Sequence, residues 1–148
     1  MASYRQIYYH IVFGTKSHKP TLTEEFSEEL YKYIWGIIRN KNCKLYRING
    51  CREHLHILSD LHPSLALADY VKDIKTGSSV WIKNHGQFLN FEGWAEGYAA
   101  FTISHSERSR IIEYIKSQKE HHKKEAFLDE YKRLLQEYGI EFDEKYLL

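Results

Sequence analysis

The sequence has few of the features that would set it apart from ordinary globular proteins. Its 148 residues include only two cysteines, two prolines and one methionine, and the net charge at neutral pH is +1. No apolar run is long enough to span a bilayer, and residues 1–5 lack the charged-then-apolar layout of a secretion signal. These absences argue against a disulfide-stapled secreted scaffold and against a membrane protein, so we expect one cytoplasmic domain.

The cysteines and the charge balance give little direct information about function. Cys43 and Cys51 lie across an expected turn without the paired spacing of a zinc site, and we expect both to be reduced. The small net charge conceals an asymmetry. Residues 103–124 carry six Lys/Arg against three Glu, whereas residues 125–148 carry three Lys/Arg against seven Asp/Glu. The basic stretch is either a surface for an anionic partner or a solvated helix face.

What the sequence does contain is a pair of histidines on an expected strand. The segment from Arg52 to Asp60 reads as a buried strand bounded by polar residues. Side chains alternate along a strand, so His54 and His56 share one face while Leu55 points into the core. Two imidazoles at this spacing can share one metal ion, or they can simply be hydrogen-bonded strand histidines.

Periodicity and turn signals order the remaining elements. Alternating apolar residues predict a strand over residues 4–13, and a capping box at Thr21–Glu24 opens a helix that ends near Asn42. A second strand over residues 43–48 is followed by an Asn49–Gly50 hairpin turn and by the histidine strand. A second helix starts at Pro63, with a break expected at residues 77–79, and residues 94–103 form a fourth strand.

This order predicts an α+β fold of the ferredoxin-like, split βαβ type, with an antiparallel sheet and its two helices on one face. If Leu55 and Ile57 meet those helices, the histidine pair lies on the open face. The first strand neighbours the third in this topology. His10 then lies on the histidine side, either at the rim of a site or as a solvated histidine.

The C-terminal third is predicted to be helical. A capping signature at Ser104–Glu107 opens a helix that runs to about Lys124, and a further helix over residues 126–138 has Gly139 as its C-cap. The apolar residues 146–148 are expected to dock against the fold. Tyr114 and Gln118 lie one turn apart on the first of these helices, among lysines. A phenol beside cations suits nucleophilic attack on a phosphate, although a tyrosine on an amphipathic helix can also be simply packed.

Taken together, these two stretches resemble the single-tyrosine HUH transposases, the IS200-like enzymes of the smallest bacterial insertion sequences. His54-Leu55-His56 matches the His-hydrophobic-His motif, and Tyr114 to Gln118 matches the Tyr-x-x-x-Gln motif of the helix that follows. Further similarity lies in residues 9–13, in residues 97–104 and in the histidines that follow Gln118. The resemblance covers nearly the whole chain, in the right order and at the right separations.

The resemblance implies a transposase that cleaves and rejoins single-stranded DNA through a 5′-phosphotyrosine intermediate at hairpin-bearing element ends. It implies that Tyr114 is the nucleophile and that His54, His56 and Gln118 hold Mg²⁺ or Mn²⁺. It also implies a homodimer, with Tyr114 acting either in cis or in trans. Residues 1–148 are then one transposase domain, in which a ferredoxin-like core (1–104) precedes the helices that carry the tyrosine (105–148).

Several further side chains are candidates for supporting roles. Glu53 precedes the histidine pair and either orients a histidine or forms a surface ion pair. The residues that could border the site are His10, His121 and His122. The lysines that could contact DNA phosphates, or simply be surface charge, are Lys16, Lys19, Lys72, Lys75 and Lys83.

Three other functions remain open on the sequence. A domesticated relative would use the same chemistry to nick hairpin repeats of its host. A non-catalytic protein could bind hairpin DNA or RNA on the sheet, although the third strand carries the histidine pair where RNA-binding sheets carry aromatics. A metal-dependent phosphodiesterase would use a water nucleophile, form no covalent intermediate and give Tyr114 no role.

Overall fold

A single four-stranded sheet organises the chain. The computed structural model describes residues 2–147. All neighbouring strands are antiparallel, in the order β2-β3-β1-β4, which is the order of the split βαβ arrangement. The predicted fold class is therefore confirmed. The helices and strands are β1 (Tyr9–Gly14), α1 (Ser27–Asn40), β2 (Leu45–Gly50), β3 (His54–Ser59), α2 (Leu67–His85), β4 (Ala99–Thr102), α3 (Arg108–Lys116), α4 (Gln118–His122) and α5 (Phe127–Glu137).

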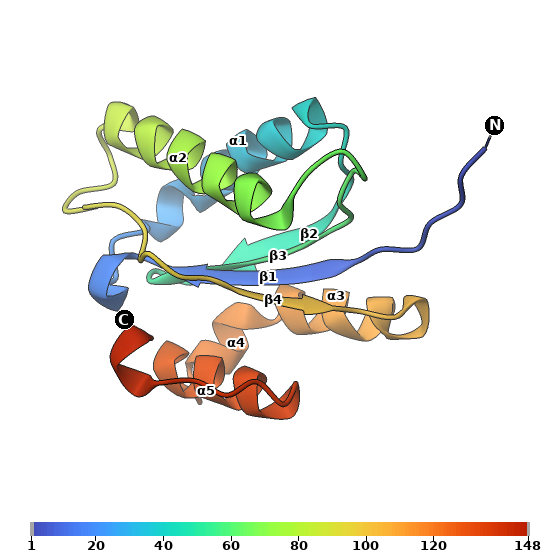
Figure 1. Cartoon of the computed structure of the whole chain (residues 1–148). Helices are drawn as coiled ribbons and strands as arrows, with labels where there is room; N and C mark the ends of the chain where they lie inside the picture. The colour runs from blue at the N-terminus through green and yellow to red at the C-terminus, as the bar shows by residue number, and fades with distance from the viewer. Residues whose placement is uncertain (1, 148) are drawn as a thin grey trace.

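Helices cover both faces of the sheet. Figure 1 shows α1 and α2 on one side and α3, α4 and α5 on the other. On the first side, alternate residues of β1 and β3 form the main core with the two helices, as the period-two pattern predicted. The sheet residues of this core are Ile11, Phe13, Leu55 and Ile57, each of them fully buried.

We expected the opposite face of the sheet to be open, but the C-terminal helices cover it. Val12 and Phe101 of the sheet pack against Phe127 and Leu134 of α5. A neighbouring cluster joins Leu58 to α3. This face also carries the histidines of β1 and β3, since they alternate with the residues of the main core. The C-terminal helices therefore form a roof that buries the histidines.

Helix α2 is continuous where the sequence predicted a break. Residues 77–79 are helical, and the helix begins at Leu67 rather than at Pro63. The small residues serve packing instead. The Ser78 hydroxyl donates to the carbonyl of Ile74 and accepts a bond from Trp94 Nε1 at 3.0 Å. A Cβ at Gly77 would lie 3.0 Å from the side chain of Ile37, so glycine allows the close approach of α1.

The turn before the histidine strand is displaced from its predicted position. Asn49 and Gly50 are the last residues of β2, and the chain reverses over residues 51–53. The Asn49 side-chain amide donates to the carbonyls of Ile115 and Lys116, both at 3.1 Å. This side chain therefore ties β2 to α3 instead of shaping a hairpin.

The C-terminal helices also differ from the prediction in detail. The long helix expected after Ser104 is interrupted at Ser117, whose ψ of 17° is not helical, so Tyr114 and Gln118 lie in two successive helices. Gly139 follows α5 with a φ of 69°, as a C-cap glycine should. In the tail, Leu147 is buried and Tyr146 is exposed. Leu148, which was expected to dock with them, lies outside the described residues.

Within residues 2–147, none of the helices combines the length and apolar character that crossing a membrane requires.

Candidate metal centre and nucleophile

Strand β3 presents both motif histidines to the roof helices. His54 and His56 are each 0% exposed, because α3 to α5 cover this face of the sheet. His10 from β1 joins them, with its Nε2 2.8 Å from Nδ1 of His56. His10 is only 1% exposed, so the expectation of a solvated histidine was wrong. Three imidazoles thus lie on one face of two neighbouring strands.

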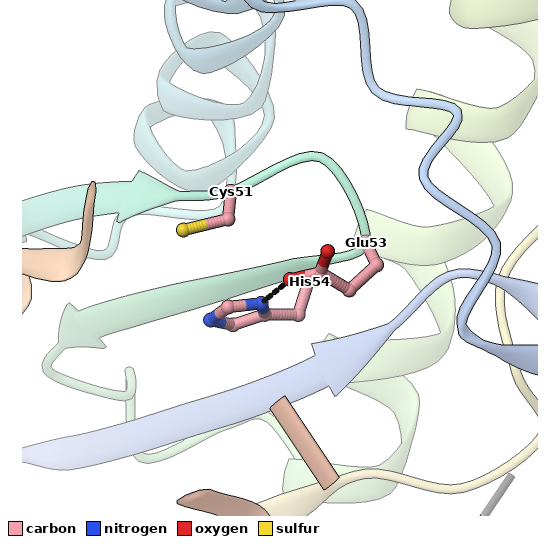
Figure 2. Close-up of side chains that lie close together, drawn as sticks. All are labelled: Cys51, Glu53 and His54. Carbon is pink, nitrogen blue, oxygen red and sulfur yellow. Dashed lines mark hydrogen bonds and ion pairs between the residues drawn. The ribbon is translucent and has the colours of Figure 1, made fainter. Parts of the chain in front are cut away.

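Glu53 sets the orientation of the first motif histidine. Its Oε1 lies 2.9 Å from Nδ1 of His54. Figure 2 draws this contact as a dashed line. Glu53 is itself buried, so the carboxylate orients an imidazole rather than forming a surface ion pair. With Nδ1 engaged, the Nε2 of His54 faces the roof helices, where the side-chain oxygen of Gln118 lies 2.9 Å away.

A carboxylate that the sequence interpretation missed stands at the centre of the cluster. Oε1 of Glu130, on α5, lies 3.3 Å from Nε2 of His54 and 3.4 Å from Nε2 of His56. Its Oε2 accepts bonds from the Gln118 amide at 3.0 Å and from the Tyr114 hydroxyl. A signal was present, because Glu130 lies on the apolar stripe of its helix. A buried charge on such a stripe requires a partner.

The protonation states follow from this packing. Burial lowers the pKa of His54, but the hydrogen bonds to Glu130 and Glu53 outweigh it and raise that pKa to about 9. Burial alone would raise the pKa of the Glu130 carboxyl, but the adjacent imidazoles of His54 and His56 hold that pKa well below its usual range. Burial lowers the pKa of His56 and of His10. The metal-free cluster therefore pairs a cationic His54 with an ionised Glu130.

Tyr114 completes the cluster from the end of α3. Its half-buried ring lies 5.8 Å from that of His56 and 4.8 Å from that of His121. Its hydroxyl donates to Glu130 and accepts a bond from Arg133 Nη2 at 2.8 Å. Burial and the charge of Glu130 raise the pKa of the phenol, whereas Arg133 acts in the opposite direction. The nucleophile predicted from sequence thus lies beside the predicted metal ligands.

The cluster fits a divalent cation. Nε2 of His56 is buried and, among the described residues, has no hydrogen-bond partner. Atoms that bind one Mg²⁺ at its usual ligand distance are about 3 Å apart when adjacent, and the atoms facing each other here are separated by 2.9–3.4 Å. Two imidazoles, a carboxylate and an amide oxygen suit Mg²⁺ or Mn²⁺ rather than a soft metal.

A second group of candidate ligands lies on the other side of His54. Cys51, Glu53 and His54 also bring ligand atoms close together, as Figure 2 shows. Here the Nδ1 of His54 is already bonded to Glu53. Burial and the nearby carboxylates of Glu53 and Glu130 raise the pKa of the Cys51 thiol to about 12, so this sulfur is protonated at neutral pH. The His54, His56 and Glu130 group is therefore the better candidate.

The other sequence candidates are distributed around this cluster. Nδ1 of His122 lies 3.4 Å from Oε1 of Glu53, the carboxylate oxygen that also contacts His54. Lys75 donates to three backbone carbonyls in the segment before β4, so its ammonium stabilises the conformation of that segment. Lys19 pairs with Glu92 at 3.4 Å. Three of the lysines predicted to contact DNA are exposed and therefore accessible to a phosphate backbone. They are Lys16, Lys72 and Lys83.

Comparison with known proteins gives consistent matches over most of the chain. The family model "Transposase IS200 like" matches residues 3–118. The transposase for insertion sequence element IS200 of Salmonella typhimurium is 27% identical over 124 residues, which is 78% of each chain. The ISDra2 transposase TnpA of Deinococcus radiodurans is 25% identical over 118 residues, covering 76% of this chain and 84% of that protein.

Two solved structures share the fold. One is the crystal structure of a candidate transposase from Deinococcus radiodurans R1, with a TM-score of 0.63 and 23% identity over 80% of this chain and 95% of that one. The other is a REP-associated tyrosine transposase bound to a REP hairpin, with a TM-score of 0.59 and 14% identity over 79% of this chain and 72% of that one. The family-matched segment contains both histidines, Tyr114 and Gln118, and it ends before Glu130 and Arg133.

Proposed function

This chain belongs to the IS200-like transposase family, and from that membership we propose that it cleaves and rejoins single-stranded DNA through a 5′-phosphotyrosine intermediate. One observation carries the proposal. The Tyr114 hydroxyl and the Nε2 atoms of His54 and His56 all face the same carboxylate, that of Glu130. A nucleophile and a metal site that share one small space can act on a single phosphate.

In this proposal His54, His56 and Gln118 hold Mg²⁺ or Mn²⁺, and Glu130 adds a carboxylate oxygen to the set. The chemistry supplied by such a cation is Lewis-acid polarisation of the phosphate oxygens. Glu53 and His10 keep the two imidazoles in place through their Nδ1 atoms. When its proton is on Nδ1, bonded to His10, His56 presents a free Nε2 lone pair to the metal.

The cleavage step transfers one bond at phosphorus. The Tyr114 oxygen attacks the scissile phosphate, its bond to phosphorus forms, and the bond from phosphorus to the 3′ oxygen breaks. The phenolic proton leaves along its hydrogen bond to Oε2 of Glu130 and is taken up by water. The departing 3′ oxygen takes a proton from water and becomes a free 3′-hydroxyl. Tyr114 is the half-buried member of the cluster, so the phosphate approaches from its side.

Rejoining reverses these events at the same residues. A 3′-hydroxyl attacks the phosphotyrosine and gives its proton to water, the bond from phosphorus to the Tyr114 oxygen breaks, and the departing phenol oxygen takes a proton from water. Because the energy of the cut phosphodiester is kept in the phosphotyrosine, no ATP is needed. The structural relative bound to a REP hairpin supports a hairpin as the recognised feature of the DNA. The exposed lysines, Lys16, Lys72 and Lys83, are proposed to contact its phosphates, and the protein is proposed to work as a homodimer.

The test uses a pool of single-stranded hairpin oligonucleotides with randomised flanks, because the target sequence is unknown. One half of the pool is labelled at the 5′ end and the other half at the 3′ end. Each half is incubated with the protein and Mn²⁺ or Mg²⁺ and is then run on a denaturing gel. We expect an adduct that carries the 3′ label only. The Tyr114→Phe variant should give no adduct.

Other outcomes would replace the proposal. Cleavage without an adduct, persisting in Tyr114→Phe, would indicate a hydrolase that uses water. DNA binding without cleavage in either metal would indicate a non-catalytic hairpin-binding protein. An adduct that carries the 5′ label would reverse the polarity of the proposed linkage.

A further inference from the structure

A guanidinium lies against the nucleophilic oxygen of the proposed site. Arg133 Nη2 donates to the Tyr114 hydroxyl oxygen at 2.8 Å, and the guanidinium carbon is 5.7 Å from the centre of the phenol ring. Glu130 accepts the proton of the same hydroxyl from the other side. Glu130 therefore accepts the hydroxyl proton, and Arg133, which stays protonated, donates to the hydroxyl oxygen.

Arg133 is held in place independently of the tyrosine. Glu125 accepts from Nε and Nη2 at 2.9–3.2 Å, and Glu137 accepts from Nη1 at 3.0 Å. A guanidinium has five N–H groups, and these bonds leave one Nη1 N–H without a protein acceptor among residues 2–147. The side chain is 36% exposed. It is thus fixed on the protein side and open to an incoming phosphate oxygen.

We propose that Arg133 is a further catalytic residue of this transposase, one that holds the Tyr114 oxygen in line for attack and stabilises the negative charge at the reacting centre. The inference rests on the proposed function, in which Tyr114 is the nucleophile. Negative charge on the phenol oxygen and on the phosphate grows as the phenolic proton leaves, and a preorganised donor lowers the energy of that state. In rejoining, the same donor stabilises the departing phenol oxygen.

Both groups that contact the Tyr114 hydroxyl come from α5, in the C-terminal part of the chain. Arg133 and Glu130 are three residues apart, so both side chains project from the same face of α5 toward Tyr114. They bind opposite sides of its hydroxyl. Both lie beyond residue 118, where the family-matched segment ends. The roof helix therefore supplies a pair of groups to a site whose motif histidines, tyrosine and glutamine lie within that segment.

The alternative is an arginine that only stabilises the ion pairs of α5. The test is single-turnover adduct formation on an oligonucleotide that the wild-type chain cleaves, together with DNA affinity and thermal stability. We expect Arg133→Gln to slow adduct formation about 10²-fold, the usual loss for one transition-state donor. The affinity for DNA should not change. Arg133→Lys, which keeps the charge without the fork, should be intermediate.

Lys132→Gln is the matched control, because it removes a neighbouring cation of α5 and its ion pair with Glu144 without touching Arg133 or Tyr114. Its rate should equal that of the wild-type chain. If Lys132→Gln slows the reaction as much as Arg133→Gln, or if Arg133→Gln reacts at the wild-type rate, the proposal is wrong. A faster Arg133→Gln would instead make the contact inhibitory. Should Arg133→Gln not fold, Arg133→Lys decides in the same way.

These outcomes are separate from those that test the proposed function. If the wild-type chain forms no adduct, or if Tyr114→Phe still forms one, then the phosphotyrosine mechanism fails. If the wild-type chain forms the adduct and Arg133→Gln matches it, only the role of Arg133 fails.

Discussion

At the scale of single residues, the site is a set of buried charges that neutralise one another. His54 is the cation and Glu130 the anion, and both are taken out of water by the roof helices. Two buried charges are tolerated only when each finds partners, and here Glu53, Gln118 and Tyr114 supply them. A divalent cation would replace the proton of His54, so metal binding and protonation compete for the same nitrogen.

The first prediction concerns the stability of the metal-free protein. The folded-state pKa of His54 is about 9, above its unfolded value of 6.5. The stabilisation is therefore fully present below pH 6.5 and is lost as the pH rises through about 9. It amounts to at most about 3 kcal/mol. Urea unfolding in EDTA at pH 6 and pH 9 should show this loss, and His54→Asn should lack it. Equal pH dependence in both proteins would contradict the prediction.

The second prediction concerns Glu130 as a metal ligand. Glu130→Gln should weaken Mn²⁺ binding by at least about tenfold, an effect that loss of an outer partner of a ligand can already produce. Asp129→Asn, the same charge change at the exposed neighbouring residue, should have little effect. Titration calorimetry measures both. Unchanged affinity in Glu130→Gln would remove Glu130 from the ligand set, and tighter binding would mean that its ion pair with His54 competes with the metal.

The residues that sequence could locate were those with a short-range pattern. His54 and His56 follow from strand alternation, and Tyr114 and Gln118 from their spacing within a family motif. Glu130 follows from neither, because its partners are 74 and 76 residues earlier in the chain. Its helix was recognised from apolar periodicity and from Gly139 as the C-cap. Only the packing of α5 on the sheet shows that this carboxylate lies next to the two motif histidines.

At the scale of elements, the β2–β3 connection holds the site in position. Cys51 N donates to the carbonyl of His54 at 3.0 Å, which closes the tight reversal. A Cβ at Gly50 would collide with that same carbonyl oxygen, which is backbone and cannot turn aside. Glycine at this position is therefore needed for close approach between the end of β2 and the first motif histidine.

The third prediction follows from this contact. Gly50→Ala should destabilise the protein by about 1–3 kcal/mol through overpacking, and it should weaken Mn²⁺ binding because His54 must shift. Gly36→Ala, within α1, meets no atom within 4 Å and should stabilise the helix by about 0.5–1 kcal/mol. Thermal unfolding of the two variants should therefore move in opposite directions. A neutral Gly50→Ala would show that the turn adapts.

Element boundaries were harder to predict than element order. The order and type of the strands and main helices followed from periodicity. Besides the break expected at residues 77–79 within α2, local signals misled at two further places. Asn49–Gly50 carries a strong hairpin signal, yet the Asn49 side chain is engaged by α3 and the turn forms later. Residues 104–124 have the sequence pattern of a single helix, yet the helix is interrupted at Ser117. In both places tertiary contacts overrode the local preference.

At the scale of the whole molecule, both faces of the sheet are occupied and they serve different purposes. One face carries the main apolar core under α1 and α2, and the other carries the candidate site under α3 to α5 (Figure 1). A division of the chain near residue 104 into a core and a tyrosine-bearing part stays a prediction. The site, however, draws on β1, β3, α3, α4 and α5 of one chain.

The last prediction concerns whether Tyr114 acts in cis. Its hydroxyl contacts Glu130 and Arg133 of its own chain, and its ring lies against His56 of the same chain. One subunit therefore contains every group of the proposed reaction. A His54→Asn, His56→Asn double variant and Tyr114→Phe should each form no adduct, and the two mixed together should also form none. Refolding the two proteins as a mixture ensures that any dimers include mixed pairs. Recovered adduct formation in the mixture would mean that the tyrosine of one subunit serves the histidines of the other, and that α3 and α4 exchange between subunits in the active form.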